Sequence, residues 1–220
     1  MKLKNIIPSL LIILFVSFPS VIKADEIVTK TMEVPYNEPT LSSITKVINN
    51  TAYVKIIYTL AGTDEVYLWS DIQLIRELYP NVTDYKIYLD CYGGVAKSGF
   101  AVGDMLAALQ KEYNVEVEAS GIVASAAMMI FLSVEKRSAL PNTMFMVHEI
   151  GLNPSSESSK LSAGDVKSLD RMFDLMTERY LDVLCRNSNL PRQKWSDMIE
   201  DTTYFWTHEA IEWGLIKEEK

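Results

Sequence analysis

Strand-like and helix-like segments alternate along this chain from residue 52 to residue 185. Four segments are rich in β-branched and aromatic side chains, which favours strands: residues 52–58, 85–91, 115–119 and 143–147. Three others carry apolar side chains at helical spacing: residues 65–78, 96–113 and 165–185. Because a helix pattern follows most of the strand patterns, the sequence predicts an α/β fold with a largely parallel sheet.

The apolar content is high enough for a proper core. Hydrophobic residues make up 48% of the 220 positions and aromatic residues 10%, which excludes a disordered chain and suits one ordinary domain. Residues 122–134 form a run without any charged side chain, too short to span a bilayer. We interpret this run as a buried helix.

The N-terminus has the pattern of a secretory signal peptide. Lys2 and Lys4 precede an almost wholly apolar stretch over residues 6–18, and Ala24 offers a small residue at a cleavage site. The sequence therefore predicts a signal peptide over residues 1–24, an extended arm over 25–50 and one folded domain over 51–220. The mature protein is expected to be exported, periplasmic or secreted, with an uncleaved membrane anchor as the alternative.

The charge balance narrows the possible partners. The chain has 21 basic and 29 acidic residues, a formal charge of −8. Cleavage would remove three lysines and leave 18 basic against 29 acidic residues, a charge of −11. Such acidity argues against nucleic acid or an anionic membrane as the main partner, and membrane contact is expected only if the signal segment stays uncleaved.

Cysteine and histidine are scarce. Cys91 and Cys185 are too few for a disulfide scaffold, although export would permit one bridge between them. No HExxH motif and no paired Cys/His spacing occurs, so we expect no metal site and no cofactor.

Three places in the sequence could carry chemistry. Gly93 and Gly94 end a strand, where backbone N–H groups without a Cβ beside them suit an anion, although such a turn is often only a turn. Ser125 lies between alanines near the start of the apolar run and could be a nucleophile or a packing residue. His148 ends an apolar strand and could be a general base or a satisfied core residue, whereas His208 is typical of solvated surface.

The order of these motifs resembles the Clp protease proteolytic subunit. Four segments follow one another in that family's order: the glycine pair at 93–94, the G-x-x-A-S segment at 121–125, the L-P-N-T turn at 140–143 and the M-V-H segment at 146–148. The E-A-I-E-W-G-L-I segment at 209–216 is similar to the family's closing segment. The resemblance covers roughly residues 50–217 and implies a ClpP/crotonase-type α/β fold, a spiral of ββα units.

The resemblance also implies roles for single residues. Ser125 would be the nucleophile, His148 the general base, and the N–H groups of Gly94 and Ala126 the oxyanion hole. The orienting acid would be Asp201, although counting back from the E-A pair places Thr202 nearest the expected position. Two further carboxylates remain as candidates for this role: Glu200 and Asp197.

The implied function is that of an exported serine endopeptidase acting on unfolded or loosely folded polypeptides. The resemblance assigns residues 165–185 to subunit stacking and implies a homo-oligomer, but an exported chain meets no ATP, so we expect no ATP-driven unfoldase partner. One alternative is a catalytically inactive scaffold or binding protein, favoured by Tyr92 at the family's proline position. The other is a Ser–Lys protease like signal peptide peptidases, which His148 after the L-P-N turn argues against.

Overall fold

The computed structural model describes residues 40–151 and 163–217, which belong to one compact unit beginning at Pro39. The predicted signal peptide and residues 25–39 of the predicted arm lie outside the described residues. Strands and helices alternate in the order β1 (Thr45–Ile48), β2 (Thr51–Ile56), α1 (Asp64–Leu78), β3 (Asp84–Cys91), α2 (Ala96–Leu109), β4 (Asn114–Ala124), α3 (Ala127–Leu132), β5 (Lys136–Ala139), β6 (Met144–Val147), α4 (Ala163–Arg186), α5 (Arg192–Glu200), β7 (Thr203–Trp206) and α6 (Thr207–Glu212).

The strands form a seven-stranded sheet in the order β1-β2-β3-β4-β6-β7, with β5 also paired to β4. Strands β2, β3, β4, β5 and β6 pair in parallel, whereas β1 and β7 close the two sides in antiparallel pairs. The predicted α/β fold with a largely parallel sheet is therefore confirmed.

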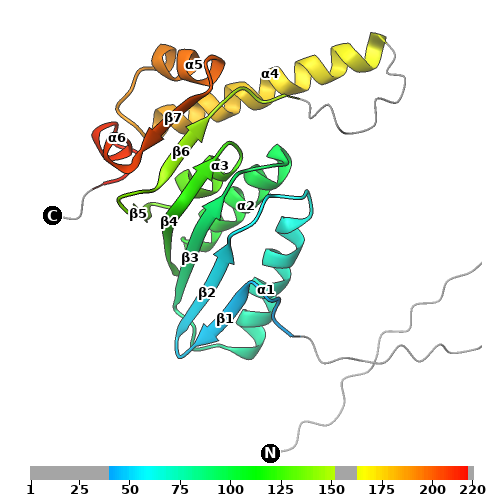
Figure 1. The fold of residues 1–220 in the computed structure, drawn as a ribbon. Coiled ribbons are helices and arrows are strands. Elements are labelled where there is room, and N and C mark those ends of the chain that lie inside the picture. Colours follow the sequence, from blue (N-terminus) through cyan, green and yellow to red (C-terminus); the bar gives the residue numbers. More distant parts are fainter. Residues whose placement is uncertain (1–39, 152–162, 218–220) are drawn as a thin grey trace, which may run out of the picture. The chain divides into compact units, whose positions relative to one another are not determined.

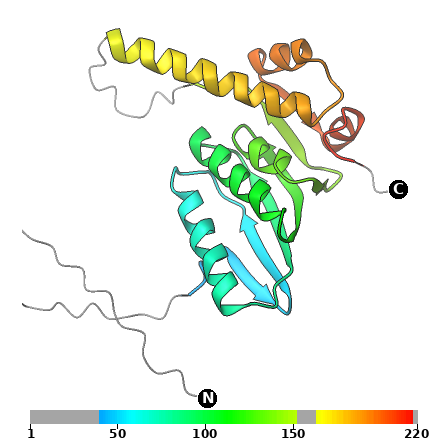
Figure 2. The same cartoon turned by 180° about the vertical axis from the view of Figure 1, so that it is seen from behind.

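Helices α1 and α2 cover one face of the sheet, as Figures 1 and 2 show from opposite sides. The side chains that alternate inward from β2, β3 and β4 meet these helices and α3 in one apolar core. Burial of alternate residues on one sheet face is the arrangement that period-2 patterning produces. The long helix α4 buries side chains only in its last two turns. Its first half extends beyond the sheet (Figure 1).

The last residues of the predicted arm form β1. Ile48 pairs with Thr51, which leaves Asn49 and Asn50 as a two-residue hairpin loop. Asn49 has a φ of +54°, a conformation that asparagine tolerates better than most residues and that tight hairpins require. The folded unit thus starts before residue 51, because this short hairpin adds a strand to the edge of the sheet.

The single buried helix predicted over residues 122–134 is wrong in its first part. Strand β4 continues to Ala124, and only Ala127–Leu132 forms a helix. A run without charges fits a central strand as well as a buried helix, so the pattern could not separate the two. Three further elements were also not predicted: β5, α5 and β7.

An aromatic cluster joins the C-terminal elements to the sheet. The ring of Phe205 on β7 stacks on Phe145 of β6 at 5.4 Å between centroids and contacts Trp213 at 4.8 Å. Trp195 of α5 packs against the same ring at 6.3 Å and donates its indole N–H to Ser188. Phe205 therefore holds β7 and α5 onto the strand that leads to His148.

Replacing Phe205, which is 1% exposed, with alanine should lower the free energy of unfolding by about 3–5 kcal/mol, because the cluster loses its central ring. Tyr204→Ala is the matched control on the opposite face of β7, where the side chain is 55% exposed, and should cost about 1 kcal/mol or less. Urea unfolding followed by circular dichroism measures both, and equal losses would contradict this role of Phe205.

Candidate active site

The candidate site lies where the carboxyl ends of three neighbouring parallel strands meet. Gly93 and Gly94 follow β3, Ser125 follows β4, and His148 follows β6. Ala124 pairs with Met146 in the β4–β6 ladder, so both strands end at nearly the same level. Loops at this edge of a parallel sheet are where α/β proteins place their ligands.

Ser125 and His148 are brought into hydrogen-bond contact. The distance from Ser125 Oγ to His148 Nε2 is 2.7 Å, and both side chains are partly exposed. The backbone of Ser125 has a φ of +55°, which residues with a Cβ seldom adopt, while its N–H still donates to the Met146 carbonyl at 2.9 Å. The serine is thus turned out of the strand direction and aimed at the histidine.

The glycine turn packs tightly against the serine. Gly93 and Gly94 have φ values of +85° and +127°, a region that favours glycine. A Cβ on Gly93 would lie 2.5 Å from the Ala124 carbonyl oxygen, and one on Gly94 would lie 2.3 Å from that of Leu60. Glycine is therefore required at position 93 for the turn to approach the strand that carries Ser125, and at position 94 for it to approach Leu60.

Two backbone N–H groups of residues that line the hollow beside the serine have no acceptor among the described residues. Leu60 donates its N–H to the Gly93 carbonyl at 2.7 Å and accepts the N–H of Val95 at 3.0 Å. These two bonds pair Leu60 with Gly94 as a parallel β-bridge. In such a pair the N–H of Gly94 points away from Leu60, to the opposite side of the turn. Within the part of the chain that the structure describes, neither this N–H nor that of Ala126 has a hydrogen-bond acceptor. Such donors can stabilise an anion that forms at the serine.

A hollow of about 70 Å³ opens beside Ser125 and His148. Its other lining is mainly apolar and consists of Ala96, Phe100, Met129, Ile150 and Tyr180, together with the backbone of Gly94, Ala126 and Gly151. The Tyr180 hydroxyl lies 3.5 Å from the Ser125 carbonyl oxygen and donates to it. Burial raises the pKa of Tyr180, which keeps this hydroxyl neutral. The hollow can take an uncharged side chain next to the serine.

The predicted acid does not join this pair. Asp201 is exposed at the end of α5 and lines a different hollow together with Asp197. Glu200 is exposed on the last turn of α5, and Asp197 accepts a hydrogen bond from Gln193. Among residues 40–151 and 163–217, no carboxylate forms a hydrogen bond with His148.

The β6–β7 ladder stops one residue before His148. Its last pair is Val147 and Thr203, so extending the register by one residue would set Thr202 opposite His148. Thr202 has a φ of +53° and donates its N–H to the Ile199 carbonyl at 3.3 Å, directly after α5, where helices often end in this conformation. Thr202 is therefore the residue at which to test an orienting acid.

Sequence analysis missed Asp90, which shapes the strand that carries the serine. Leu89 pairs with Ala119 and Cys91 with Val123, so Asp90 alone faces three residues of β4. Its carboxylate accepts the N–H of Ile122 at 3.0 Å and holds this irregularity. The signal available was an aspartate at the end of a strand and a glycine before the serine segment, but neither indicates a contact.

The structure also bears on the cysteines, on a possible metal site and on a possible membrane-spanning helix. Cys91 is buried and Cys185 is partly buried, and the structure gives both as free thiols, so the bridge left open by the sequence is not formed. Across the described residues, no cluster of three His, Cys, Asp or Glu side chains is placed to hold a metal ion. None of the described helices is long and apolar enough to cross a membrane.

An α/β fold with a serine hydrogen-bonded to a histidine, beside backbone N–H groups without an acceptor, is typical of serine hydrolases. The family model of the Clp protease matches residues 44–218, and the chain therefore belongs to the Clp protease family. It is 27% identical over 146 residues to ATP-dependent Clp protease proteolytic subunit 3 of Rhizobium etli, covering 66% of this chain and 72% of that protein.

Further relatives give the same result. The chain is 26% identical over 167 residues to proteolytic subunit 2 of the ATP-dependent Clp protease of Pseudomonas aeruginosa, covering 74% of this chain and 79% of that protein. Its fold is similar to that of a ClpP1 variant from Listeria monocytogenes, with a TM-score of 0.60, 22% identity and coverage of 76% of this chain and 92% of that one. The predicted ClpP-type fold is thus confirmed.

Thr202→Asp should raise the rate at which a fluorophosphonate probe labels Ser125 by about tenfold or more, because a carboxylate beside His148 stabilises the imidazolium. Thr202→Asn, which relieves the same backbone strain without a charge, is the matched control and should leave the rate nearly unchanged.

Asp201→Asn belongs to the same labelling series and should change the rate less than about twofold, because Asp201 does not touch His148. A fall approaching the roughly 10⁴-fold loss known for replacing a triad aspartate would instead identify Asp201 as the orienting acid.

Proposed function

We propose that the chain is a serine peptidase that hydrolyses peptide bonds in unfolded or loosely folded polypeptides. The observation that carries the proposal is the 2.7 Å hydrogen bond from Ser125 Oγ to His148 Nε2, beside the unpaired N–H groups of Gly94 and Ala126. Membership of the Clp protease family supports the same activity.

The residues of the site have complementary roles in the first half of the reaction. His148 accepts the Ser125 hydroxyl proton at Nε2 while the serine oxygen bonds to the carbonyl carbon of the substrate. The oxygen of the resulting tetrahedral intermediate carries a negative charge, which the N–H groups of Gly94 and Ala126 stabilise. The C–N bond then breaks, the leaving amine takes the proton from His148, and an ester with Ser125 remains.

Water completes the reaction through the same groups. His148 accepts a proton from water as the water oxygen bonds to the ester carbon, and the same N–H groups stabilise the second intermediate. The bond to Ser125 Oγ breaks, and His148 returns its proton to that oxygen. The carboxylic acid product leaves and the free serine is restored.

The site also bears on the alternatives that the sequence left open. Among the described residues no lysine lines the hollow around Ser125, and Lys97 extends into solvent to pair with Glu65 at 2.7 Å. This arrangement favours His148 over a lysine as the base. No described carboxylate orients His148. The experiment must therefore separate an active peptidase from a catalytically inactive scaffold with the same fold.

Labelling with a fluorophosphonate probe tests the proposal. We expect one adduct on Ser125 in the wild-type protein, no adduct in Ser125→Ala, and at least a hundredfold slower labelling in His148→Gln because the general base is lost. His208→Gln is the matched control, since His208 is exposed on α6, and should label like the wild type. A folded wild-type protein without an adduct between about pH 6 and about pH 9 would indicate the inactive scaffold.

We further propose that the mature protein acts outside the cytoplasm as a homo-oligomer. The signal-peptide pattern of residues 1–24 supports export. Exposed apolar side chains on α4, ahead of its buried last two turns, support assembly: Val166, Met172 and Leu175. An apolar surface of this kind on a helix that buries only its end favours contact with another subunit.

Expression of the full chain in a bacterium with an export pathway tests both parts on one preparation. We expect protein from the extracytoplasmic fraction to begin at Asp25 and to sediment with a mass that is a multiple of the 196-residue chain. An intact N-terminus in the cytoplasmic fraction would contradict export, and a mass of one chain would contradict assembly.

A further inference from the structure

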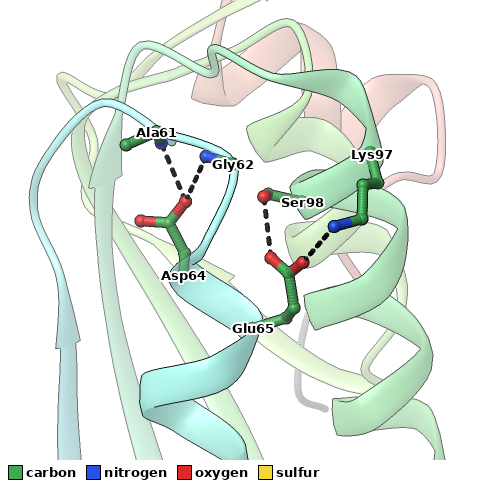
Figure 3. Close-up of polar contacts among 6 residues, drawn as sticks. All are labelled: Ala61, Gly62, Asp64, Glu65, Lys97 and Ser98. Carbon is green, nitrogen blue, oxygen red and sulfur yellow. Dashed lines mark hydrogen bonds and ion pairs between the residues drawn. The ribbon is translucent and has the colours of Figure 1, made fainter. Parts of the chain in front are cut away.

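A buried carboxylate stands at the start of α1, outside the groups that the proposed reaction uses. Asp64 is 6% exposed, and one of its oxygens accepts the N–H of Ala61 at 2.8 Å and that of Gly62 at 3.1 Å (Figure 3). Both donors belong to the loop that joins β2 to α1. A buried carboxylate that accepts two N–H groups fixes a loop more firmly than neutral bonds do, since charge-assisted hydrogen bonds are the stronger kind.

This loop holds the glycine turn of the candidate site. Leu60, directly before the two N–H groups that Asp64 binds, makes backbone hydrogen bonds on both sides of Gly94. The Leu60 side chain is buried, so packing in the core fixes its position. Asp64 sets the direction in which the backbone leaves Leu60.

A second contact joins the start of α1 to the segment that follows the turn. Glu65 accepts hydrogen bonds from the Lys97 ammonium at 2.7 Å and from the buried Ser98 hydroxyl at 2.8 Å, both in the first turn of α2 (Figure 3). Its bond to Lys97 and further hydrogen bonds lower the pKa of Glu65 to about 2, so this carboxylate stays charged at working pH. The start of α1 thereby contacts the chain after Gly94 directly, and the residues on either side of Gly94 through Leu60.

Burial and the negative charge of Asp64 raise the pKa of two groups, near the end of β2 and at the end of β3. Burial raises the pKa of the Cys91 thiol, and the negative charge of Asp64 raises it further. Burial and the same charge raise the pKa of Tyr58 to about 12. The Cys91 sulfur in turn accepts the N–H of Gly93 at 3.4 Å, which joins the end of β3 to the turn.

We propose that Asp64 is a positioning residue that holds the Gly94 N–H where the oxyanion forms. The inference rests on the proposed peptidase function. Asp64 touches neither the serine nor the hollow beside it, so its effect is expected on the rate of the reaction. It acts through Ala61, Gly62 and the Leu60 bridge. A donor must lie within about 3 Å of the developing oxyanion, and a shift of about 1 Å in such a group can cost roughly a hundredfold in rate.

Kinetic constants of the full chain on a peptide substrate test this inference. Asp64→Ala should lower kcat by about tenfold or more and leave KM within about twofold, because a donor used only in the transition state is displaced. The rate of fluorophosphonate labelling should fall in parallel, since the phosphonyl oxygen occupies the same donors. Asp64→Asn keeps an oxygen acceptor and should retain most of kcat.

Asp71 provides a matched control on the same helix. It is 2% exposed, and its carboxylate accepts the N–H of Ser42 at 2.8 Å and the Ser42 hydroxyl, but Ser42 does not line the site. Asp71→Ala therefore removes an equally buried carboxylate with two bonds and should leave kcat of the folded protein unchanged. Asp64→Ser, whose hydroxyl is too short to hold both N–H groups, is measured in parallel in case the alanine variant does not fold.

Each result decides the matter. A selective fall of kcat in the Asp64 variants, with rescue by asparagine and none of it in Asp71→Ala, supports the inference. Equal kcat in folded Asp64 and Asp71 variants, or a change confined to KM, overturns it while the proposed function stands. A wild-type protein that neither labels nor cleaves overturns the proposed function first, and this inference with it.

Discussion

The parallel pairing of β4 with β6 is the contact on which the candidate site depends. Ala124 lies opposite Met146, and this register sets Ser125 and His148 just past the ends of their strands, at 2.7 Å. A slip by one residue would turn every side chain of β6 to the other face of the sheet. The aromatic cluster behind β6 and the core beneath β4 resist such a slip, so the packing energy of the fold secures the geometry of the site.

Backbone strain is concentrated around this pair. Ser125 and Thr202 have positive φ, a conformation that costs on the order of 1–3 kcal/mol for residues with a Cβ. Gly93 and Gly94 adopt the same region at little cost and allow the turn to touch the serine strand. The surrounding core offsets this strain, and the result is a site whose N–H groups are oriented before any substrate arrives.

Much of this arrangement could be predicted from the chain. The alternation of patterns indicates the α/β class, because hydrophobic periodicity follows from local geometry. The residues of the glycine turn, Ser125 and His148 are recognisable because they stand in the order of a known family. Strand β7 and the true end of β4 could not be predicted, since a short apolar run does not reveal whether its neighbours pair with it as strands.

By itself, the sequence determined the class of fold, the family and the residue types at the site, because these depend on local pattern and motif order. Only the tertiary structure decided which groups meet. It ended the β6–β7 ladder on Val147 and Thr203, left Asp201 exposed at the end of α5, and connected Asp64 to the glycine turn through Leu60. Such contacts join segments far apart in the chain, and their register follows from packing and from hydrogen bonds between strands, which no local pattern encodes.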